Sequence, residues 1–273
     1  MKNRLLSKIQ SAKRGHEKLF CAFLTLGYPS LGITEKLAAA FDKLGVDILE
    51  LGFPFSDPLA DGPTIQASSE YALKRGVKLE DAFQLVSRLR QKGVRMPILF
   101  FTYFNPVYHY GPEAFVARAK RSGFDGAIIP DLPPDEEIGF QNKCRKENFT
   151  QVFLIAPTTS SERAAKIAQK SRGFIYYVSL RGVTGARKAI PGDLKKRLAC
   201  LRKMTSKPLL VGFGVSTPAQ AAEISRLSDG VIIGSALIER LGRSRGNPSE
   251  TLRYTQTMLR AVKGRIDGRS AGA

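Results

Sequence analysis

Two acidic side chains, Glu50 and Asp61, lie near each other in a segment made mostly of apolar and chain-breaking residues. Glu50 is inside the run ILELGF, and Asp61 follows in SDPLADGP. The stretch Val46–Phe53 is rich in branched apolar residues and predicts a buried strand. A carboxylate in such a strand loses hydration and needs a partner or a chemical task. We therefore place the candidate catalytic chemistry at Glu50 and Asp61.

The residues that follow the predicted strand contain Pro54, Pro58, Gly62 and Pro63, which are too many helix breakers for a helix. Asp61 is therefore expected on a constrained loop. Both carboxylates also have structural alternatives. A glutamate on a strand can be paired or face an edge, and an aspartate in such a loop can stabilise a turn or cap a helix.

Length and composition narrow the class of protein. The chain has 273 residues, 43% of them hydrophobic, which is enough to bury a large core. No stretch approaches the roughly 20 apolar residues of a membrane span. The N-terminus MKNRLLSKIQSAKRGHEK predicts a short amphipathic helix without the apolar core of a secretory signal. We expect no membrane association and a cytoplasmic location.

The cysteines and histidines exclude further classes. The three cysteines are far apart and lack a CxxC spacing, which is typical of reduced thiols. Two histidines are too few for a histidine-rich metal site, so we expect no metal. The net charge of +19 is spread over predicted helices and tails, without a basic patch interleaved with aromatic residues. We interpret it as a solvated surface that steers anionic substrates, and we expect no nucleic-acid partner.

Strand and helix patterns alternate along the whole chain. Apolar strand candidates occur at Phe20–Leu26, Val46–Phe53, Ile98–Phe104, Gly126–Ile129, Val152–Ala156, Phe174–Leu180, Pro208–Val211 and Gly230–Ile233. Helical spacing occurs at Thr34–Leu44, Leu79–Lys92, Pro112–Ser122, Glu136–Asn148, Ser161–Ser171, Leu194–Met204, Pro218–Leu227 and Pro248–Val262. Eight such units predict a (β/α)8 TIM barrel; a doubly wound open sheet is the alternative. Without a linker, we expect one domain over residues 1–273, with a core at about 18–263 and a disordered tail at 264–273.

In a barrel, the C-terminal ends of the strands and the loops after them converge on one end of the molecule. Glu50 and Asp61 are both expected there. The loops after the last three predicted strands contain glycines, in SLRGVTGAR, GFGVS and GSA. Glycine allows close backbone approach, and a helix N-terminus supplies free N–H groups, so these loops predict a phosphate site. The expected ligand is a phosphorylated small molecule.

Six strings, in this order and spacing, resemble the tryptophan synthase alpha chain family. They run from about Phe20 to Leu237 and read LELGFPFSDPLADGPTIQ, PDLPPDE, LIAPTT, YYVSLRGVTGAR, VGFGVSTP and GVIIGSAL. The resemblance implies a barrel that cleaves indole-3-glycerol phosphate to indole and glyceraldehyde 3-phosphate. It places the family's two catalytic carboxylates at Glu50 and Asp61. It further implies a PLP-dependent beta chain as partner in an alpha2 beta2 complex, and no cofactor in this chain.

The chemistry of that cleavage fits the residue types. The reaction must protonate a ring carbon of indole, remove a proton from the neighbouring hydroxyl, and stabilise positive charge at the ring nitrogen. A semi-buried carboxyl with a raised pKa suits the proton transfers and is assigned to Glu50. An ionised carboxylate that binds the indole N–H is assigned to Asp61. A Schiff-base aldolase would need a strand lysine, and the predicted strands contain no internal lysine.

The remaining candidate residues surround this pair. The substrate-binding candidates are Phe23, Phe101, Tyr103, Tyr176, Thr184, Gly185, Phe213, Gly214, Gly234 and Ser235. Each of the aromatic residues could equally be barrel core. Contacts with the beta chain are expected at Asp57, Pro58, Asn105 and Pro106, and the loop Arg181–Gly192 is expected to close over substrate as a lid. A second hypothesis keeps the fold but makes the chain mainly an activating subunit of the beta chain.

Overall fold

Eight parallel strands form a closed barrel at the centre of the molecule. The computed structural model describes residues 3–178, 193–212 and 214–264. In these ranges, each strand pairs with its sequence neighbours, and β8 pairs with β1 to close the barrel. The strands are β1 (Leu19–Thr25), β2 (Ile48–Gly52), β3 (Ile98–Phe101), β4 (Gly126–Ile128), β5 (Thr150–Ile155), β6 (Ile175–Val178), β7 (Leu209–Gly212) and β8 (Gly230–Ile233). The closed barrel confirms the (β/α)8 prediction and rules out the open doubly wound sheet.

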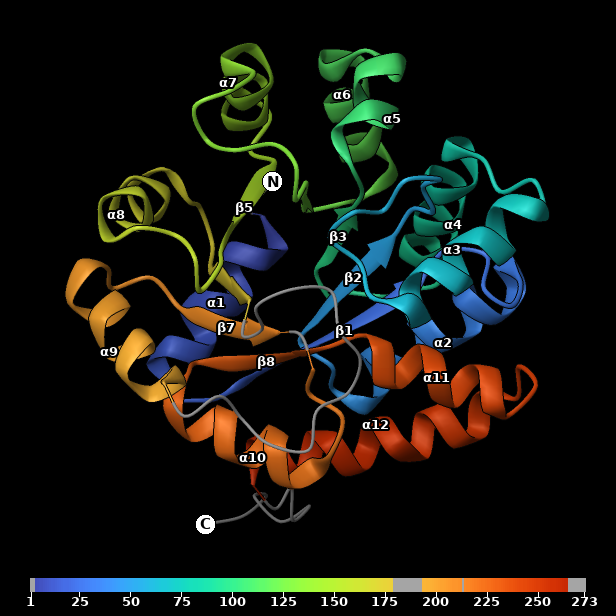
Figure 1. The fold of residues 1–273 in the computed structure, drawn as a ribbon. Helices are drawn as coiled ribbons and strands as arrows, with labels where there is room; N and C mark the ends of the chain where they lie inside the picture. Colours follow the sequence, from blue (N-terminus) through green and yellow to red (C-terminus); the bar gives the residue numbers. More distant parts are fainter. Residues whose placement is uncertain (1–2, 179–192, 213, 265–273) are drawn as a thin grey trace.

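Helices surround the barrel on its outside, as Figure 1 shows. In the described residues they are α1 (Arg4–Arg14), α2 (Leu31–Leu44), α3 (Pro63–Lys74), α4 (Leu79–Gln91), α5 (Phe104–Tyr110), α6 (Pro112–Ser122), α7 (Ile138–Lys146), α8 (Ser161–Lys170), α9 (Leu194–Met204), α10 (Pro218–Leu227), α11 (Ser235–Arg243) and α12 (Pro248–Lys263). The N-terminal amphipathic helix is confirmed as α1. None of these helices combines the length and apolar character that a membrane span needs.

Three helices were not predicted from the sequence. Helix α3 begins at Pro63, which the sequence analysis treated as a helix breaker. Proline is tolerated at the first helical position, because its missing N–H would have no intrahelical partner there. Helix α5 occupies residues assigned to the end of a strand and a following loop, so β3 ends at Phe101 rather than Phe104. Helix α11 starts directly after Gly234, within a segment that was expected to be a loop.

Side chains alternate between the two faces of each strand and so form two apolar clusters. On β1, Phe20, Ala22 and Leu24 belong to the outer cluster, which packs against the helices. Cys21 and Phe23 belong to the inner cluster, inside the barrel. Because this alternation has a period of two, a residue's position in its strand decides whether its side chain points into the barrel.

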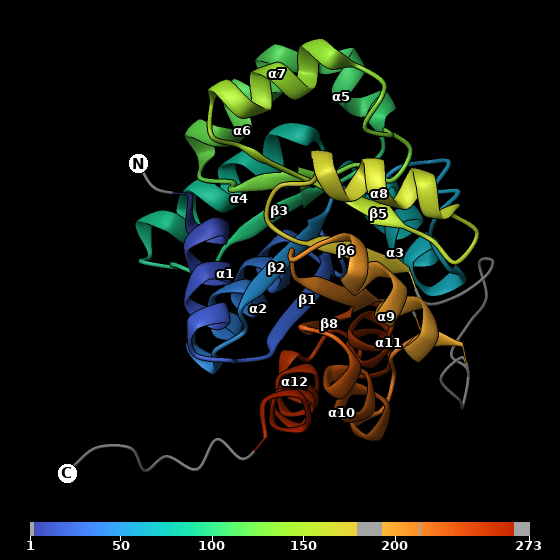
Figure 2. The same cartoon turned by 90° about the vertical axis from the view of Figure 1, so that its left-hand side faces the viewer.

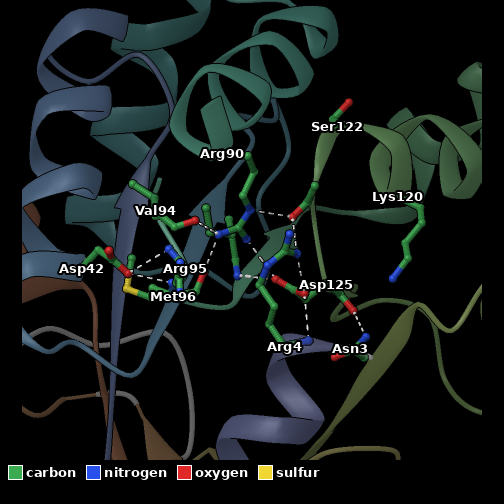
Figure 3. A network of polar contacts seen from close by, with 12 residues as sticks. Asn3, Arg4, Asp42, Arg90, Val94, Arg95, Met96, Lys120, Ser122 and Asp125 are labelled. Carbon is green, nitrogen blue, oxygen red and sulfur yellow. Dashed lines mark hydrogen bonds and ion pairs between the residues drawn. The ribbon is translucent and has the colours of Figure 1, made fainter. Parts of the chain in front are cut away.

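Helix α1 covers the end of the barrel at which the strands begin (Figure 2). Its buried side chains Leu5, Ile9 and Ala12 pack into the inner cluster. Figure 3 shows how the start of this helix is held: the Asp125 carboxylate binds Arg4 Nη1 at 3.1 Å and Arg90 Nη2 at 3.0 Å. Because α1 covers the N-terminal ends of the strands, a substrate can enter only at their C-terminal ends.

Asp47, at the start of β2, is a second anchor for the helices. The buried Asp47 carboxylate accepts hydrogen bonds from Lys8 of α1 at 3.2 Å and from Lys263 of α12 at 2.8 Å. It also accepts one from the Phe20 backbone N–H at 2.8 Å. One carboxylate therefore ties the first and last helices of the chain to the barrel. This explains the second acidic residue of the predicted strand as a structural one.

Candidate active site

Glu50 lies inside the barrel. It is two residues after the inward-facing Ile48 on the same strand, so both side chains lie on the same face. Its side chain is 1% exposed, and its backbone pairs with Phe23 of β1 and Leu99 of β3. The Cys21 thiol lies 3.4 Å from Glu50 Oε1 in hydrogen-bond contact. Burial raises the pKa of the Glu50 carboxyl to about 8, and the bond from Cys21 opposes that rise. Glu50 can therefore hold or release a proton near neutral pH.

Asp61 lies on the loop between β2 and α3, as predicted. Its buried carboxylate accepts a hydrogen bond from the Tyr103 hydroxyl, with 3.1 Å between Oη and Oδ2. The same hydroxyl accepts a hydrogen bond from the Ala60 backbone N–H at 2.9 Å, which fixes the loop to the barrel. Burial raises the pKa of Asp61 to about 6, and the Tyr103 bond lowers it in part. Asp61 is therefore the more acidic of the two carboxyl groups.

Tyr176 on β6 connects the two carboxyl groups electrostatically. Its phenol is buried in the inner cluster, and burial raises its pKa well above the usual range. The charges of Glu50 and Asp61 raise that pKa further, so both carboxyl groups lie close enough to interact with this one phenol. A Cβ at Gly212 would lie 2.5 Å from the Tyr176 hydroxyl, so only glycine at that position accommodates the ring.

Phe23 of β1 and Phe101 of β3 form an aromatic pair inside the barrel. Their ring centroids are 5.5 Å apart, with the planes at 87°. A Cβ at Gly52 would lie 2.4 Å from the Phe23 ring, which explains the glycine of the LELG motif. A Cβ at Gly234 would lie 3.3 Å from the Phe23 Cβ, so the residue directly after β8 also packs against Phe23. The structure thus places Phe23 close to both Phe101 and Gly234.

The predicted phosphate residues fall only partly within the described structure. Gly214 and Gly234 are half-buried, and Ser235 is the exposed first residue of α11. The first N–H groups of a helix have no intrahelical acceptor, so the start of α11 presents free donors at this end of the barrel. Thr184, Gly185, Phe213 and the expected lid Arg181–Gly192 lie outside the described residues, as does the tail after Gly264.

The predicted partner-contact residues lie at the surface of the same end of the molecule. Asp57 is exposed and Pro58 half-exposed on the loop between β2 and α3. Asn105 and Pro106 belong to helix α5 instead of the expected loop. Directly after Pro58 the chain exposes a large apolar side chain that was not predicted, Leu59, which is 83% exposed.

A family model described as the tryptophan synthase alpha chain matches residues 9–266. The chain belongs to the tryptophan synthase alpha chain family. It is 44% identical over 261 residues to the tryptophan synthase alpha chain of Citrifermentans bemidjiense, an alignment that covers 96% of this chain and 97% of the relative. It is 42% identical over 242 residues to that of Synechocystis, with 88% and 90% covered.

Solved structures agree with these relatives. A tryptophan synthase structure from Mycobacterium tuberculosis matches with a TM-score of 0.88 and 33% identity, covering 96% of this chain and 99% of the other. The crystal structure of tryptophan synthase subunit alpha from Legionella pneumophila matches with a TM-score of 0.88 and 32% identity, with the same shares covered.

Membership of the tryptophan synthase alpha chain family confirms the reaction expected from the motifs. The chain is a carbon–carbon lyase of tryptophan biosynthesis that cleaves indole-3-glycerol phosphate to indole and glyceraldehyde 3-phosphate. The alpha chain has the beta chain as its partner. PLP belongs to that beta chain, and the alpha chain needs no cofactor.

Other aldol mechanisms use a lysine on a barrel strand or a bound metal ion. None of the eight described strands contains a lysine. Residues 3–178, 193–212 and 214–264 hold no group of three His, Cys, Asp or Glu side chains that could bind a metal ion.

Sequence reasoning missed one contact, the thiol of Cys21 on Glu50. The signal was available: Cys21 has the same strand parity as Phe23, one strand away from Glu50.

Proposed function

We propose that Glu50 and Asp61 perform the cleavage of indole-3-glycerol phosphate, with Glu50 as the proton carrier and Asp61 as the electrostatic stabiliser. One observation supports this assignment above all. Two buried carboxyl groups that interact with the same phenol, Tyr176, have pKa values of about 8 and about 6. Between these values one group holds a proton while the other is ionised, which is the division of roles that the reaction requires.

Glu50 enters the reaction protonated and gives its proton to the indole ring carbon that carries the side chain. The resulting carboxylate then accepts the proton of the neighbouring side-chain hydroxyl as the carbon–carbon bond breaks. The group thus returns to its starting state, and indole and the aldehyde leave. Positive charge develops at the ring nitrogen after the first transfer, and the ionised Asp61 binds that N–H more strongly as it does so.

The substrate's two ends are assigned to different walls of the barrel. The aromatic pair Phe23 and Phe101 would hold the indole ring, and the hydroxyl of Tyr103 would orient Asp61 beneath it. The phosphate would lie at the start of α11, where the backbone of Gly234 and the N–H and hydroxyl groups of Ser235 supply donors. Gly214, whose φ is +81°, would bring its backbone to the same phosphate.

We place the beta chain on the loop between β2 and α3 and on helix α5. The contact residues are Asp57, Pro58, Asn105 and Pro106, and the exposed Leu59 directly after Pro58 supplies the apolar anchor that such interfaces need. The complex would have two alpha and two beta chains. With no membrane-spanning helix among the described residues, we assign the enzyme to the cytoplasm.

Indole release from indole-3-glycerol phosphate, with and without the beta chain, tests the catalytic assignment. Glu50→Gln should lower kcat by about 10²–10⁴-fold, and Asp61→Asn by about 10²–10³-fold. Glu162→Gln, an exposed carboxylate on α8, is the matched control and should match the wild type. Binding of an indole alkyl phosphate without the reactive hydroxyl groups should persist in all variants. Near wild-type turnover by Glu50→Gln would contradict the assignment, and no turnover by the wild type would favour a purely activating subunit.

A further inference from the structure

The contact between Cys21 and Glu50 has no assigned role in the chemistry described above. Cys21 lies on β1 and Glu50 on β2, both facing the barrel interior. The Cys21 backbone pairs with Ile48, so Cys21 lies two register positions before Glu50, toward the end that α1 covers. The thiol is 0% exposed, and its sulfur lies 3.4 Å from Glu50 Oε1, within hydrogen-bond range for sulfur.

The Cys21 thiol donates a hydrogen bond to the Glu50 carboxyl group. Among the described residues, Tyr176 of β6 interacts electrostatically with Glu50, Cys21 and Asp61, and Cys21 interacts also with Asp47 at the start of β2. Of these groups, Cys21 contacts Glu50 directly through its sulfur. One carboxyl oxygen, Oε1, is thereby oriented toward the closed end of the barrel.

The thiol remains a donor throughout the working pH range. Burial raises the pKa of Cys21 well above its usual value, and the charges of Glu50 and Asp47 raise it further. A thiol that keeps its proton can donate to the carboxylate but cannot compete with it as a base. Hydrogen bonding of this kind favours the charged form of the acceptor.

We propose that Cys21 is a positioning residue for the reaction: its S–H bond to Oε1 fixes the orientation of the Glu50 carboxyl group and favours its carboxylate form. This inference rests on the proposed role of Glu50 as proton carrier. It assigns a function to a cysteine that the sequence presented as an ordinary reduced thiol. The apolar surroundings strengthen the effect, because Leu5 and Ile9 of α1 lie in the same inner cluster and exclude water from the thiol.

Infrared spectroscopy of the S–H stretch tests the contact without depending on activity. The difference between spectra of the full chain and of Cys21→Ala isolates the band of this thiol. The band should lie at lower frequency than that of the buried Cys144, isolated in the same way with Cys144→Ala. It should move as pH is raised through about 8, where Glu50 ionises. In Glu50→Gln the pH dependence of the band frequency should vanish. A wild-type band whose frequency does not change with pH would overturn the proposal.

The pH dependence of kcat/KM for indole release, measured with the beta chain present, tests the consequence. Cys21→Ala should move the basic limb, which reports Glu50, to higher pH by about half to one pH unit. Cys21→Ser keeps a donor and should return the limb toward its wild-type position. Cys144→Ala removes a buried thiol elsewhere and should leave the limb in place.

A basic limb that stays in place in Cys21→Ala, with only thermal stability reduced, would show that the thiol merely fills space. The two arms separate this proposal from the proposed function. If the wild type released no indole, the infrared titration would still report the bond between the thiol and the carboxyl group. If the infrared band shifted as expected but Glu50→Gln retained activity, the function assigned to Glu50 would fail while the contact stood.

Discussion

Removing the Tyr103 hydroxyl should move the acid limb of the pH–activity profile. In Tyr103→Phe, the ring can still stack on Phe55, whose centroid lies 5.2 Å away, so packing is preserved. The bond from Oη to Asp61 Oδ2, now 3.1 Å long, is lost. The Ala60 N–H loses its acceptor as well. The change therefore acts on the ionisation and position of one carboxylate.

The size of the effect follows from the charge on the acceptor. A hydrogen bond to a charged group contributes about 1.5–3 kcal/mol, which corresponds to a pKa change of about 1 to 2. The Tyr103 bond lowers the pKa of Asp61, so its loss should raise that pKa from about 6 to between about 7 and 8. Asp61 acts in its ionised form, so the activity lost as pH falls is lost earlier. At pH 7, the ionised fraction should drop from about nine tenths to between about one half and one tenth.

Indole release measured from pH 5 to pH 9.5 with saturating beta chain provides the assay. At pH 7, kcat/KM should fall about two- to tenfold, and the ratio of wild type to variant should approach one as pH rises. Comparing ratios cancels the titration of the substrate phosphate, which is common to both enzymes. Tyr71→Phe on α3 is the control, and its ratio should stay near one at every pH. A ratio for Tyr103→Phe that is large but independent of pH would refute this reasoning, because it would mean that the hydroxyl only orients the loop.

Three further results are expected. Glu50→Gln should raise the melting temperature more at pH 9 than at pH 5, with a difference in unfolding free energy of a few kcal/mol. The reason is that folding raises the pKa of Glu50 to about 8, so the wild type loses stability as pH rises through that value. An equal gain at both pH values would contradict this. Asp125→Ala should lower the free energy of urea unfolding by about 3–5 kcal/mol, because it removes the buried, charged acceptor of hydrogen bonds from Arg4, Arg90 and the Ile98 backbone N–H. Asp135→Ala on the surface should cost about 0–1 kcal/mol. Leu59→Ser should weaken beta-chain binding about tenfold in a titration calorimeter, while Ile138→Ser, also an exposed apolar residue, should leave the affinity unchanged; equal weakening by both would remove Leu59 as a specific anchor.

The strands were predictable from sequence because a parallel barrel buries each of them on both faces. That requirement produces continuous apolar runs such as Ile98–Phe101, which stand out against polar helices. The unpredicted helices lack that contrast. Helix α5, FNPVYHY, is short and rich in aromatic residues, and α3 starts with a proline. Local propensity is a weak guide for such segments, because tertiary context overrides it.

The sequence by itself determined the residue types and the elements that carry them: a glutamate within a buried strand, an aspartate in a glycine- and proline-rich loop, and motifs of one family. It also indicated that Glu50 and Asp61 would lie at the same end of a barrel, because the C-terminal ends of the strands and the loops after them converge there. The sequence did not determine which groups touch these carboxylates. Cys21 contacts Glu50 across 29 residues, and Tyr103 contacts Asp61 across 42. These contacts depend on strand register and on closure of the barrel, so only the tertiary structure decided them. Burial raises both pKa values and these hydrogen bonds lower them in part, and both effects exist only in the folded chain.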